Sequence, residues 1–400
     1  MADHPGESDS QYSTSHVIGA YFKRLLMKIM HIQKVAGIGG SERHLLKLLP
    51  GLIERDIKIR MCVLSADKAE EFTTAMREDG VDVVTIPAGP HANPIMVARL
   101  IREINEFAPD LIHTHLIHAD LYGQFAAWIR GRPGVSSVHG PKSFYRSQPI
   151  RSLAKWGGHT ARRTIAISEH VAVFLKNLSL VPPSRLRVIP YGIDVDEWSV
   201  DSGQRSKTRS EMGFMSEDVV IGAFSRLVSG KGHETLIQAF SDAAHGVPRL
   251  HLLISGEGPL RGSLEELASS LRIGNVRFTG FIKDVPRVMG ACDVVAFPTL
   301  PELGEGFGLA ALEAMAIGLP VVGSTVGSLP EVISDQETGL LTRPGDVVEL
   351  ANALLRIGED QSLRRRLGQA GRERARTMFS FERMASSTVA LYEEVTNEQD

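Results

Sequence analysis

The strongest constraint on the fold is an alternation of short apolar runs with helical patterns, which fills two successive halves of the chain. Apolar runs of strand length begin at residue 27 and again at residue 219, and a helical pattern follows each. Strands separated by helices pair in parallel, with helices on both faces of the sheet. The sequence therefore predicts an α/β protein with two doubly wound, Rossmann-like domains.

The expected strands can be placed from these apolar runs. In the first half they are residues 27–33, 59–64, 81–86, 111–115, 136–139 and 164–167. In the second half they are residues 219–224, a run that ends at 255, and residues 276–280, 293–298, 321–324 and 339–341. In parallel sheets of this kind ligands bind at the carboxyl ends of the strands, so we expect a ligand site at these ends.

Composition excludes several classes of protein. A net charge of -3 across 400 residues gives no overall attraction to nucleic acid. Cys62 and Cys292 are the only cysteines and both lie in apolar runs, so we expect no disulfide framework and a reducing, cytoplasmic environment. No apolar run is long enough to span a membrane, and residues 1–15 are too polar for a secretion signal.

The stretch PELGEGFGLAALEAMAIGLP, at residues 301–320, has the pattern of a ligand site. On a helix, Glu305 and Glu313 would be separated by two turns and would lie on roughly one side. Gly304, Gly306 and Gly308 permit a close approach of backbone to ligand, and free N–H groups at a helix start attract anions. A phosphate-binding loop with a carboxylate at each end would suit a sugar nucleotide, which has hydroxyl groups on both sides of its diphosphate. A plain loop with two solvated glutamates is the alternative.

The same stretch resembles the Glu-x7-Glu signature of retaining glycosyltransferases of family 4, which have the GT-B fold. The surrounding Gly-Phe-Gly, Glu-Ala-Met-Ala and Gly-Leu-Pro-Val-Val are in place as well. The resemblance implies that Glu305 binds hydroxyls of the transferred sugar and that Glu313 binds the ribose hydroxyls. It also implies donor contacts from Gly306, Phe307 and Gly308.

The resemblance covers about residues 27–395, and the composition of the remaining and connecting segments completes the division of the chain. Residues 1–26 would be a disordered or amphipathic extension, and 27–200 the acceptor-side domain. The polar segment 201–217 would be a linker, 218–378 the nucleotide-sugar-binding domain, and 379–400 a helix that crosses back to the first domain.

A glycine turn follows the first strand. Gly39 and Gly40 belong to Gly-Ile-Gly-Gly-Ser-Glu, which resembles the family's Gly-Gly-x-Glu loop beside the donor diphosphate. The Gly-x-Gly-x-x-Gly spacing of a dinucleotide fingerprint is absent, which disfavours a dehydrogenase with tandem dinucleotide folds.

Histidines gather at the ends of two strands in the first half. His139 ends a strand before Gly140, and in the family a histidine at the matching position contacts the transferred sugar. His113, His115 and His118 could instead suggest a metal. In a strand the first two share a face while His118 lies beyond its end, so we expect packed or hydrogen-bonded histidines, one of which could line the acceptor cleft.

Two cations follow the first strand of the second half. Arg226 and Lys231 stand in Ser-Arg-Leu-Val-Ser-Gly-Lys-Gly, where a planar guanidinium and a compact ammonium would suit a diphosphate. A solvated surface turn is the alternative. The pair resembles the family's Arg and Lys that neutralise the leaving diphosphate, and Gly256 follows at the expected strand end.

The segment 141–163 carries six Lys or Arg residues, three aromatic residues and no acid. A surface that meets an anionic membrane or a lipid-linked, diphosphate-bearing acceptor is one interpretation. A solvated basic helix is the other. The acidic total and the fold argue against nucleic acid.

These features favour a retaining glycosyltransferase that moves a sugar from a nucleoside diphosphate donor, such as a UDP- or GDP-sugar, to a hydroxyl of a glycan or lipid-linked acceptor. The resemblance implies a hexosyltransferase of polysaccharide, lipopolysaccharide or glycolipid assembly that needs no metal or other cofactor and is cytoplasmic, with contact to the inner face of the membrane. A glycogen- or sucrose-synthase-type glucosyltransferase and a non-catalytic nucleotide-sugar-binding protein are the alternatives.

Overall fold

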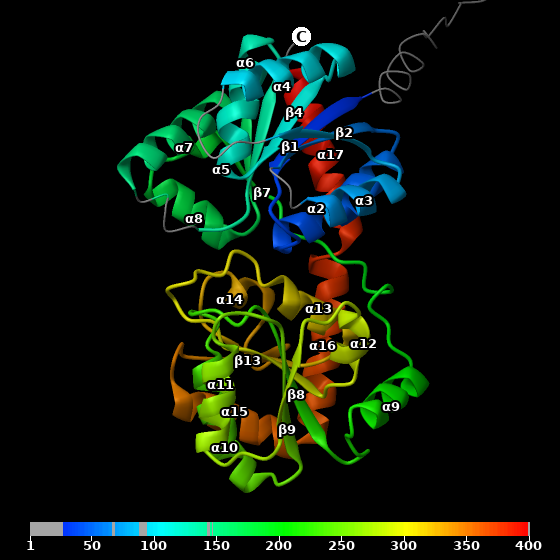
Figure 1. Cartoon of the computed structure of the whole chain (residues 1–400), viewed down its shortest axis with the longest axis vertical. Coiled ribbons are helices and arrows are strands. Elements are labelled where there is room, and N and C mark those ends of the chain that lie inside the picture. The colour runs from blue at the N-terminus through cyan, green and yellow to red at the C-terminus, as the bar shows by residue number, and fades with distance from the viewer. Residues whose placement is uncertain (1–26, 66–68, 88–93, 142–144, 146, 399–400) are drawn as a thin grey trace, which may run out of the picture.

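The computed structural model describes residues 27–65, 69–87, 94–141, 145 and 147–398, which form two α/β domains stacked along the long axis (Figure 1). The N-terminal sheet has the order β3-β2-β1-β4-β5-β6-β7 and the C-terminal sheet the order β10-β9-β8-β11-β12-β13. All strand pairs within these two sheets are parallel. The expected fold, two doubly wound Rossmann-like domains, is confirmed.

The N-terminal sheet is buried on both faces because its strands are apolar on both sides. Helices α2, α3 and α17 cover one face, and α4 and α6 cover the other. The strands are β1 (Lys28–Lys34), β2 (Lys58–Ser65), β3 (Asp82–Pro87), β4 (Leu111–His115), β5 (Gly134–Val138), β6 (Arg163–Ala166) and β7 (Leu186–Val188). The helices include α2 (Gly40–Ile53), α3 (Glu70–Glu78), α4 (Pro94–Phe107), α5 (Leu116–Ala119), α6 (Phe125–Ile129), α7 (Gln148–Thr160) and α8 (Glu169–Asn177).

The C-terminal sheet is also sandwiched, with α10, α11 and α15 on one face and α12 and α13 on the other. Its strands are β8 (Val219–Phe224), β9 (Leu250–Ser255), β10 (Val276–Gly280), β11 (Val294–Phe297), β12 (Val321–Ser324) and β13 (Gly339–Thr342). The helices are α10 (His233–Gly246), α11 (Arg261–Ser270), α12 (Val285–Gly290), α13 (Leu309–Ile317), α14 (Leu329–Val332), α15 (Val347–Glu359) and α16 (Gln361–Met378).

Helix α13 is apolar nearly all round because it lies between the sheet and the other domain. Its buried residues belong to an apolar cluster that continues into α8 and β6 of the N-terminal domain. The helix ends at Gly318, whose φ of 93° is left-handed, and Pro320 follows shortly after. The main core of the C-terminal domain therefore reaches the surface where the two domains meet.

Helix α17 (Phe381–Asn397) belongs in space to the N-terminal domain, although it follows the C-terminal domain in sequence (Figure 1). The chain crosses at Ile193, whose N–H donates to the carbonyl of Phe379 at 2.8 Å and whose carbonyl accepts from Phe381 N–H at 3.0 Å. Tyr392 of α17 is fully buried against the sheet.

Residues 201–217, where we expect a linker, contain helix α9 (Ser202–Glu211). Asp201 caps this helix by accepting from Gln204 N–H, and Arg205 and Arg209 both pair with Asp293, at 2.5 and 3.0 Å. The polar composition therefore reflects a charged helix that docks on the C-terminal domain. In the described ranges, no helix combines the length and apolar character needed to cross a bilayer.

Candidate active site

The loop before α13 holds the first expected carboxylate, but not on a helix. Helix α13 begins at Leu309 after Gly308, which adopts a left-handed φ of 83°. Glu305 precedes both, and its Oε1 accepts the N–H of Gly308 at 3.3 Å. The expectation that Glu305 and Glu313 lie two turns apart on one helix is therefore wrong. Glu305 instead lies against the N-terminus of α13, where the helix dipole favours negative charge.

Lys231 pairs with this carboxylate. It lies in the turn between β8 and α10, and its Nζ donates to Glu305 Oε2 at 2.8 Å. The ammonium also lies 5.0 Å from the ring centroid of Phe297, which ends β11. Arg226 lies in the same turn and is exposed, and its guanidinium has no ion pair in the described part of the chain. Two cations therefore stand at one strand-to-helix turn, one paired to Glu305 and one facing solvent.

Glu313 lies one turn inside α13 and pairs across the domain boundary. Its Oε1 is 2.8 Å from Nη1 of Arg43, which is on α2 of the other domain. Glu313 is only 3% exposed, and burial raises the pKa of its carboxyl to about 7, although the Arg43 guanidinium opposes that shift. The carboxylate expected to bind ribose is thus held by an arginine that the sequence did not single out.

The glycine turn after β1 presents the start of α2. Gly39 is the N-cap of α2, and its N–H donates to Glu42 Oε2 at 2.9 Å. Gly40 is the first residue of the helix, and a Cβ there would have no atom within 4 Å. Glu42 is buried and also accepts from Gln33 Nε2 at 2.6 Å. This network holds the turn rigidly and places Arg43 toward α13.

Gly306 lies where the two domains approach each other closely at the site. A Cβ on Gly306 would lie 2.6 Å from the carbonyl oxygen of His139, so a larger residue would push the domains apart. The carbonyl of Gly306 accepts from Ser168 Oγ at 2.8 Å. Ser168 is also the N-cap of α8, where its side chain accepts from Val171 N–H. The strand ends of both sheets therefore face one another across this loop.

Two other residues that we expect to contact the donor substrate pack against neighbouring parts of the protein. The ring of Phe307 is buried between Tyr191 and Phe379, with centroids at 5.2 and 5.7 Å. Only its backbone is left to meet a donor. Gly256 has φ of 142°, and a Cβ there would lie 2.0 Å from the carbonyl of Ser225. That glycine allows the ends of β8 and β9 to approach, which places the Arg226 turn.

His139 lies just after β5, with both ring nitrogens bonded inside the protein. Nδ1 is 2.5 Å from the hydroxyl of Tyr191, and Nε2 is 3.1 Å from Nδ1 of His115. Burial lowers the pKa of His139 to about 3, so the ring is neutral. The carbonyl oxygen of His139, and not its ring, lies against the position that a Cβ on Gly306 would take.

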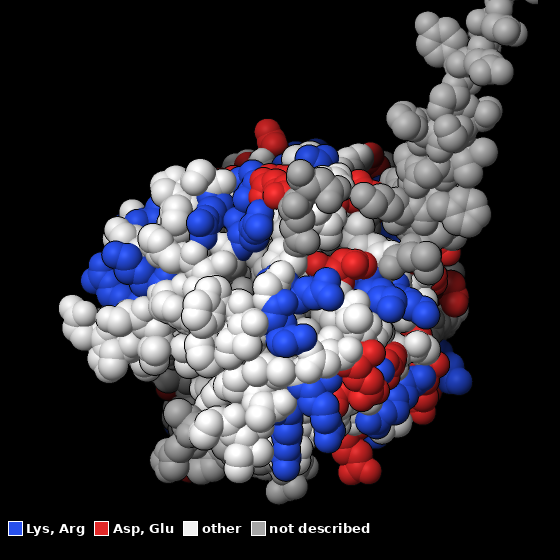
Figure 2. Space-filling view, turned by 90° about the horizontal axis from the view of Figure 1, so that it is seen from above, with Lys and Arg blue, Asp and Glu red and all other residues white. Residues whose placement is uncertain are grey.

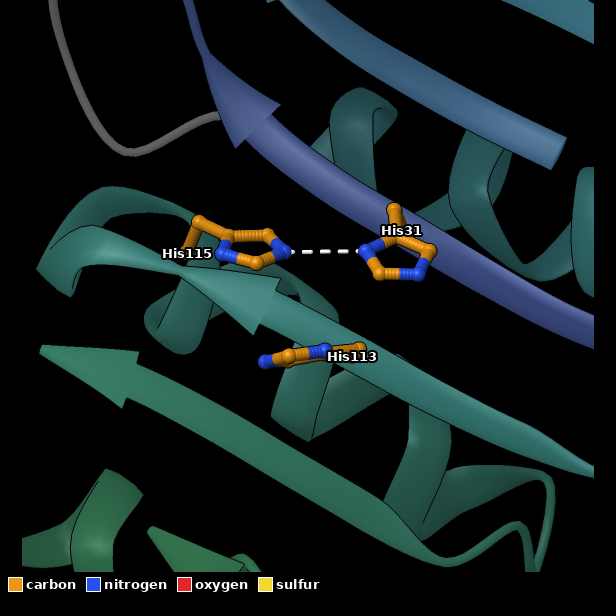
Figure 3. Close-up of side chains that lie close together, drawn as sticks. All are labelled: His31, His113 and His115. Atoms are coloured by element: carbon orange, nitrogen blue, oxygen red, sulfur yellow. Dashed lines mark hydrogen bonds between the residues drawn. The ribbon is translucent and has the colours of Figure 1, made fainter. Parts of the chain in front are cut away.

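The histidine cluster that the structure forms is not the expected one of His113, His115 and His118. His118 is exposed, and His31 of β1 takes its place beside His113 and His115, with one ring nitrogen from each within 4.8 Å of the others (Figure 3). All three rings are buried, and burial is the main cause that lowers their pKa values. His31 joins them because β1 lies next to β4, where His31 is paired with His113.

Two residues at this site were not predicted from the sequence. Arg43 follows the Gly-Gly-Ser-Glu turn directly, and this position is only a weak indication of a role at the site. Tyr191 lay in the Pro-Tyr-Gly segment before residue 193, but nothing local indicated that its hydroxyl would meet His139. These contacts join segments more than 50 residues apart, so they depend on the tertiary fold.

Comparisons with known proteins identify the family of both halves of the chain. The profile of Glycosyl transferases group 1 matches residues 204–374, and that of Glycosyltransferase Family 4 matches residues 38–197. D-inositol 3-phosphate glycosyltransferase of Saccharomonospora viridis is 30% identical over 376 residues, which cover 81% of this chain and 84% of the relative. The GDP-mannose-dependent alpha-(1-6)-phosphatidylinositol monomannoside mannosyltransferase of Mycolicibacterium smegmatis is 29% identical over 320 residues, 76% of this chain and 82% of the relative.

A solved structure is similar over the same length. HepE of Anabaena, crystallised with UDP, superposes with a TM-score of 0.83 at 26% identity, and the match covers 92% of this chain and 100% of that one. The fold and the site together define a glycosyltransferase with the GT-B architecture. The chain belongs to the family 4 glycosyltransferases, the group 1 glycosyl transferases of the matched profiles.

Proposed function

We propose that the protein is a retaining glycosyltransferase that moves a hexose from a nucleoside diphosphate sugar to an acceptor hydroxyl without a metal ion. One observation carries the proposal. The N-terminus of α13 lies between two carboxylates, Glu305 and Glu313, and each of these is already matched to a cation. Hydroxyl groups of a sugar and of a ribose are the natural partners of such carboxylates, with a diphosphate between them.

The charges at this site suit the loss of a diphosphate. When the bond between the anomeric carbon and the phosphate oxygen breaks, its electron pair leaves with the diphosphate. Arg226, Lys231 and the N-terminus of α13 would stabilise that negative charge, which is the role a metal ion has in other transferases. Glu305 would hold the sugar hydroxyls, because its carboxylate lies beside Lys231 and the helix start.

The N-terminal domain would supply the acceptor side. The carbonyl of His139 reaches the α13 loop at Gly306, and the α2 turn with Gly39 and Gly40 lies beside the same boundary. In our proposal the acceptor oxygen forms the new bond on the face from which the diphosphate leaves. The acceptor proton passes to the departing phosphate oxygen, so atoms and charge balance and the anomeric configuration is retained.

Relatives narrow the donor class. The mannosyltransferase of Mycolicibacterium smegmatis uses GDP-mannose by its name, and HepE of Anabaena has been crystallised with UDP-glucose. We therefore propose a UDP- or GDP-hexose as donor and a glycan, inositol-containing or lipid-linked hydroxyl as acceptor. A glycogen- or sucrose-synthase-type reaction and nucleotide-sugar binding without transfer are the alternatives that a donor screen would separate.

Nucleotide binding should depend on Glu313. We expect Glu313→Ala to raise the Kd for the nucleoside diphosphate about 100-fold, because the change removes two charge-assisted hydrogen bonds to ribose at about 1.5 kcal/mol each. Calorimetric titration measures the effect. Glu302→Ala is the matched control, since Glu302 is exposed and lies on the same loop. An unchanged Kd for Glu313→Ala would remove Glu313 from the donor site.

A surface on the N-terminal domain suits the inner face of an anionic membrane. Residues 121–168 contain eight Lys or Arg residues and no Asp or Glu, although Arg162 and Arg163 pair with glutamates at the C-terminal end of α17. Figure 2 shows Lys and Arg side chains among uncharged ones on the left of that view. Large apolar side chains of α6 and α7 are exposed beside them, among them Phe125, Trp128 and Trp156. Trp128 is 66% exposed and Phe125 stacks on it at 5.9 Å. Aromatic rings flanked by cations suit a headgroup region. Lys142, Phe144 and Arg146 lie outside the described residues.

Membrane contact is expected to depend on this aromatic surface. Trp128→Ala should lower binding to vesicles that contain phosphatidylglycerol by about fivefold, whereas vesicles of phosphatidylcholine alone should bind neither protein. Co-sedimentation measures both. Met215→Ala, which removes an exposed apolar side chain from the C-terminal domain, is the control. Equal binding by wild type and Trp128→Ala would contradict the assignment.

The proposed transferase is tested by a donor screen with the full chain. UDP- and GDP-hexoses are offered in the presence of EDTA, and thermal stabilisation and slow hydrolysis are followed together. We expect one donor both to stabilise the protein and to be hydrolysed. Stabilisation by nucleoside diphosphates without hydrolysis or transfer, with every donor and acceptor offered, would instead favour the non-catalytic alternative.

A further inference from the structure

An unbroken chain of hydrogen bonds runs through the N-terminal domain to the candidate site. It passes through three buried histidines, the part-buried His139 and two tyrosines, and one of these tyrosines comes from the C-terminal helix α17. Figure 3 shows the central link, in which His31 Nδ1 lies 2.9 Å from His115 Nε2. In order from the interior, the members are Ser137, His113, Tyr392, His31, His115, His139 and Tyr191.

The close group of His31, His113 and His115 has the geometry of hydrogen bonding rather than of metal ligation. Two nitrogens that ligate one tetrahedral ion at 2.0–2.1 Å are about 3.3 Å apart, whereas His31 Nδ1 and His115 Nε2 are 2.9 Å apart. His113 is held by Tyr392 at 2.6 Å and by Ser137 at 2.7 Å. Each ring nitrogen of the three histidines already has a protein partner, so a metal would have to break the chain.

The tautomers of His31, His115 and His139 depend on one another. A neutral imidazole has one N–H and one bare nitrogen, and each hydrogen bond between two rings needs one of each. If His139 carries its proton on Nε2, then Nδ1 of His115 is bare and its Nε2 is protonated. His31 must then be protonated on Nε2 as well. If His139 carries its proton on Nδ1, the same reasoning places the proton of every ring on Nδ1.

Tyr392 extends this dependence to the C-terminal helix. Its hydroxyl is 2.6 Å from His113 Nδ1 and 3.4 Å from His31 Nε2, so it can donate to one ring and accept from the other. Burial lowers the pKa values of the rings, which favours neutral rings with one proton each, the state on which the dependence rests.

The other end of the chain is Tyr191, which lies at the candidate site. Its ring packs on Phe307 of the α13 loop and stacks on His44 at 4.3 Å. The carboxylates of Glu42 and Glu305 are close enough to contribute to the raised pKa of its phenol, although burial is the larger cause. When His139 is protonated on Nε2, Tyr191 donates to its Nδ1. When His139 is protonated on Nδ1, Tyr191 accepts from it and its own proton is available to an oxygen atom nearby.

We propose that His31, His115 and His139 form one tautomeric unit that determines whether the hydroxyl of Tyr191 donates into the protein or toward a sugar oxygen at the site. In this unit His31 and Tyr392 are positioning residues, since they act through other side chains and not on the substrate. The assignment of a sugar hydroxyl as the partner of Tyr191 rests on the proposed function. The dependence among the protons of the three rings does not rest on it.

The first test needs no substrate. Histidine labelled with ¹⁵N in the full chain reports, by NMR at pH 7, which nitrogen of each ring carries the proton. We expect His31, His115 and His139 to be neutral and to share one tautomer. Different tautomers in any two of these rings, a charged ring, or a metal ion that copurifies with the protein would overturn the proposal.

The second test uses Tyr392→Phe with Tyr122→Phe as its control. Tyr122 is a half-buried tyrosine of the same domain that has no place in the chain. We expect Tyr392→Phe to change the tautomer populations of His31, His115 and His139 together, and to lower kcat about fivefold with KM for the donor within about twofold. Tyr122→Phe should change neither. A change confined to His31, or an equal loss of kcat in the control, would contradict the positioning role. If no sugar is transferred at all, the proposed function fails while the NMR result still decides the coupling of the rings.

Discussion

Replacing Arg226 with alanine is expected to slow sugar transfer about 100-fold, with little change in the affinity for the nucleoside diphosphate. Arg226 lies in the turn after β8, five positions before Lys231, and it is exposed. Its planar guanidinium would meet the diphosphate as negative charge accumulates on the leaving group. Removal of one preorganised donor to such a charge costs about 100- to 1,000-fold in kcat in well-studied enzymes.

The kinetic constants distinguish this role from simple donor binding. A lower kcat with an unchanged donor KM indicates an interaction made in the transition state, whereas a raised KM alone indicates uniform binding. Arg249→Ala is the control, because Arg249 is an exposed arginine of the same domain whose partner is Glu217. If Arg226→Ala and Arg249→Ala have equal and small effects, the turn after β8 is a solvated surface.

Acid should destabilise the protein steeply below pH 6.5. Burial lowers the pKa of His31 and of His139 from 6.5 to about 3, and it lowers those of His44, His113 and His115 as well. Between these values the unfolded chain binds a proton that the folded protein does not. The free energy of unfolding therefore falls as the pH falls, by about 1.4 kcal/mol per pH unit for each such histidine.

Two buried carboxyl groups have the opposite effect on the pH dependence of the free energy of unfolding. Burial raises the pKa of Glu313 from 4.5 to about 7 and that of Asp120 from 3.8 to about 7. These groups bind protons in the folded protein first, so their contribution to stability falls as the pH rises through this window. Burial also lowers the pKa values of His118 and His233, so seven histidines outweigh two carboxyls, and we expect the free energy of unfolding to rise from pH 5 to pH 6.5.

Urea unfolding at several pH values measures this slope. His31→Leu should lower the slope by about 1.4 kcal/mol per pH unit relative to wild type, because one buried histidine is removed. His159→Leu is the control, since His159 is exposed on α7. Equal slopes for wild type and His31→Leu would mean that His31 takes up its proton in the folded protein.

The fold could be predicted largely from the sequence, because strand burial and helix periodicity are local signals. Strands β4, β8, β10 and β12 have the expected bounds. The start of α13 also shows where local reasoning fails. Spacing alone put Glu305 on a helix, but the left-handed Gly308 starts the helix after it.

The partners of the site residues could not be predicted in this way. Arg43 meets Glu313 only because α2 and α13 belong to domains that face each other. His31 replaces His118 in the histidine group because strand order places β1 beside β4, although the two are separated by two other strands in sequence. Likewise the polar segment 201–217 gave no sign that Asp293 would hold its two arginines and make it a docked helix.

The stereochemistry of sugar release decides whether the protein is a retaining, metal-independent transferase. The donor that stabilises the protein is incubated with the full chain in EDTA, and proton NMR at early times records which anomer of the free hexose, or of the transferred sugar, forms first. From an α-linked nucleoside diphosphate hexose we expect the α anomer and release of the nucleoside diphosphate without metal. Initial formation of the β anomer, or a reaction that stops when EDTA is added, would contradict it.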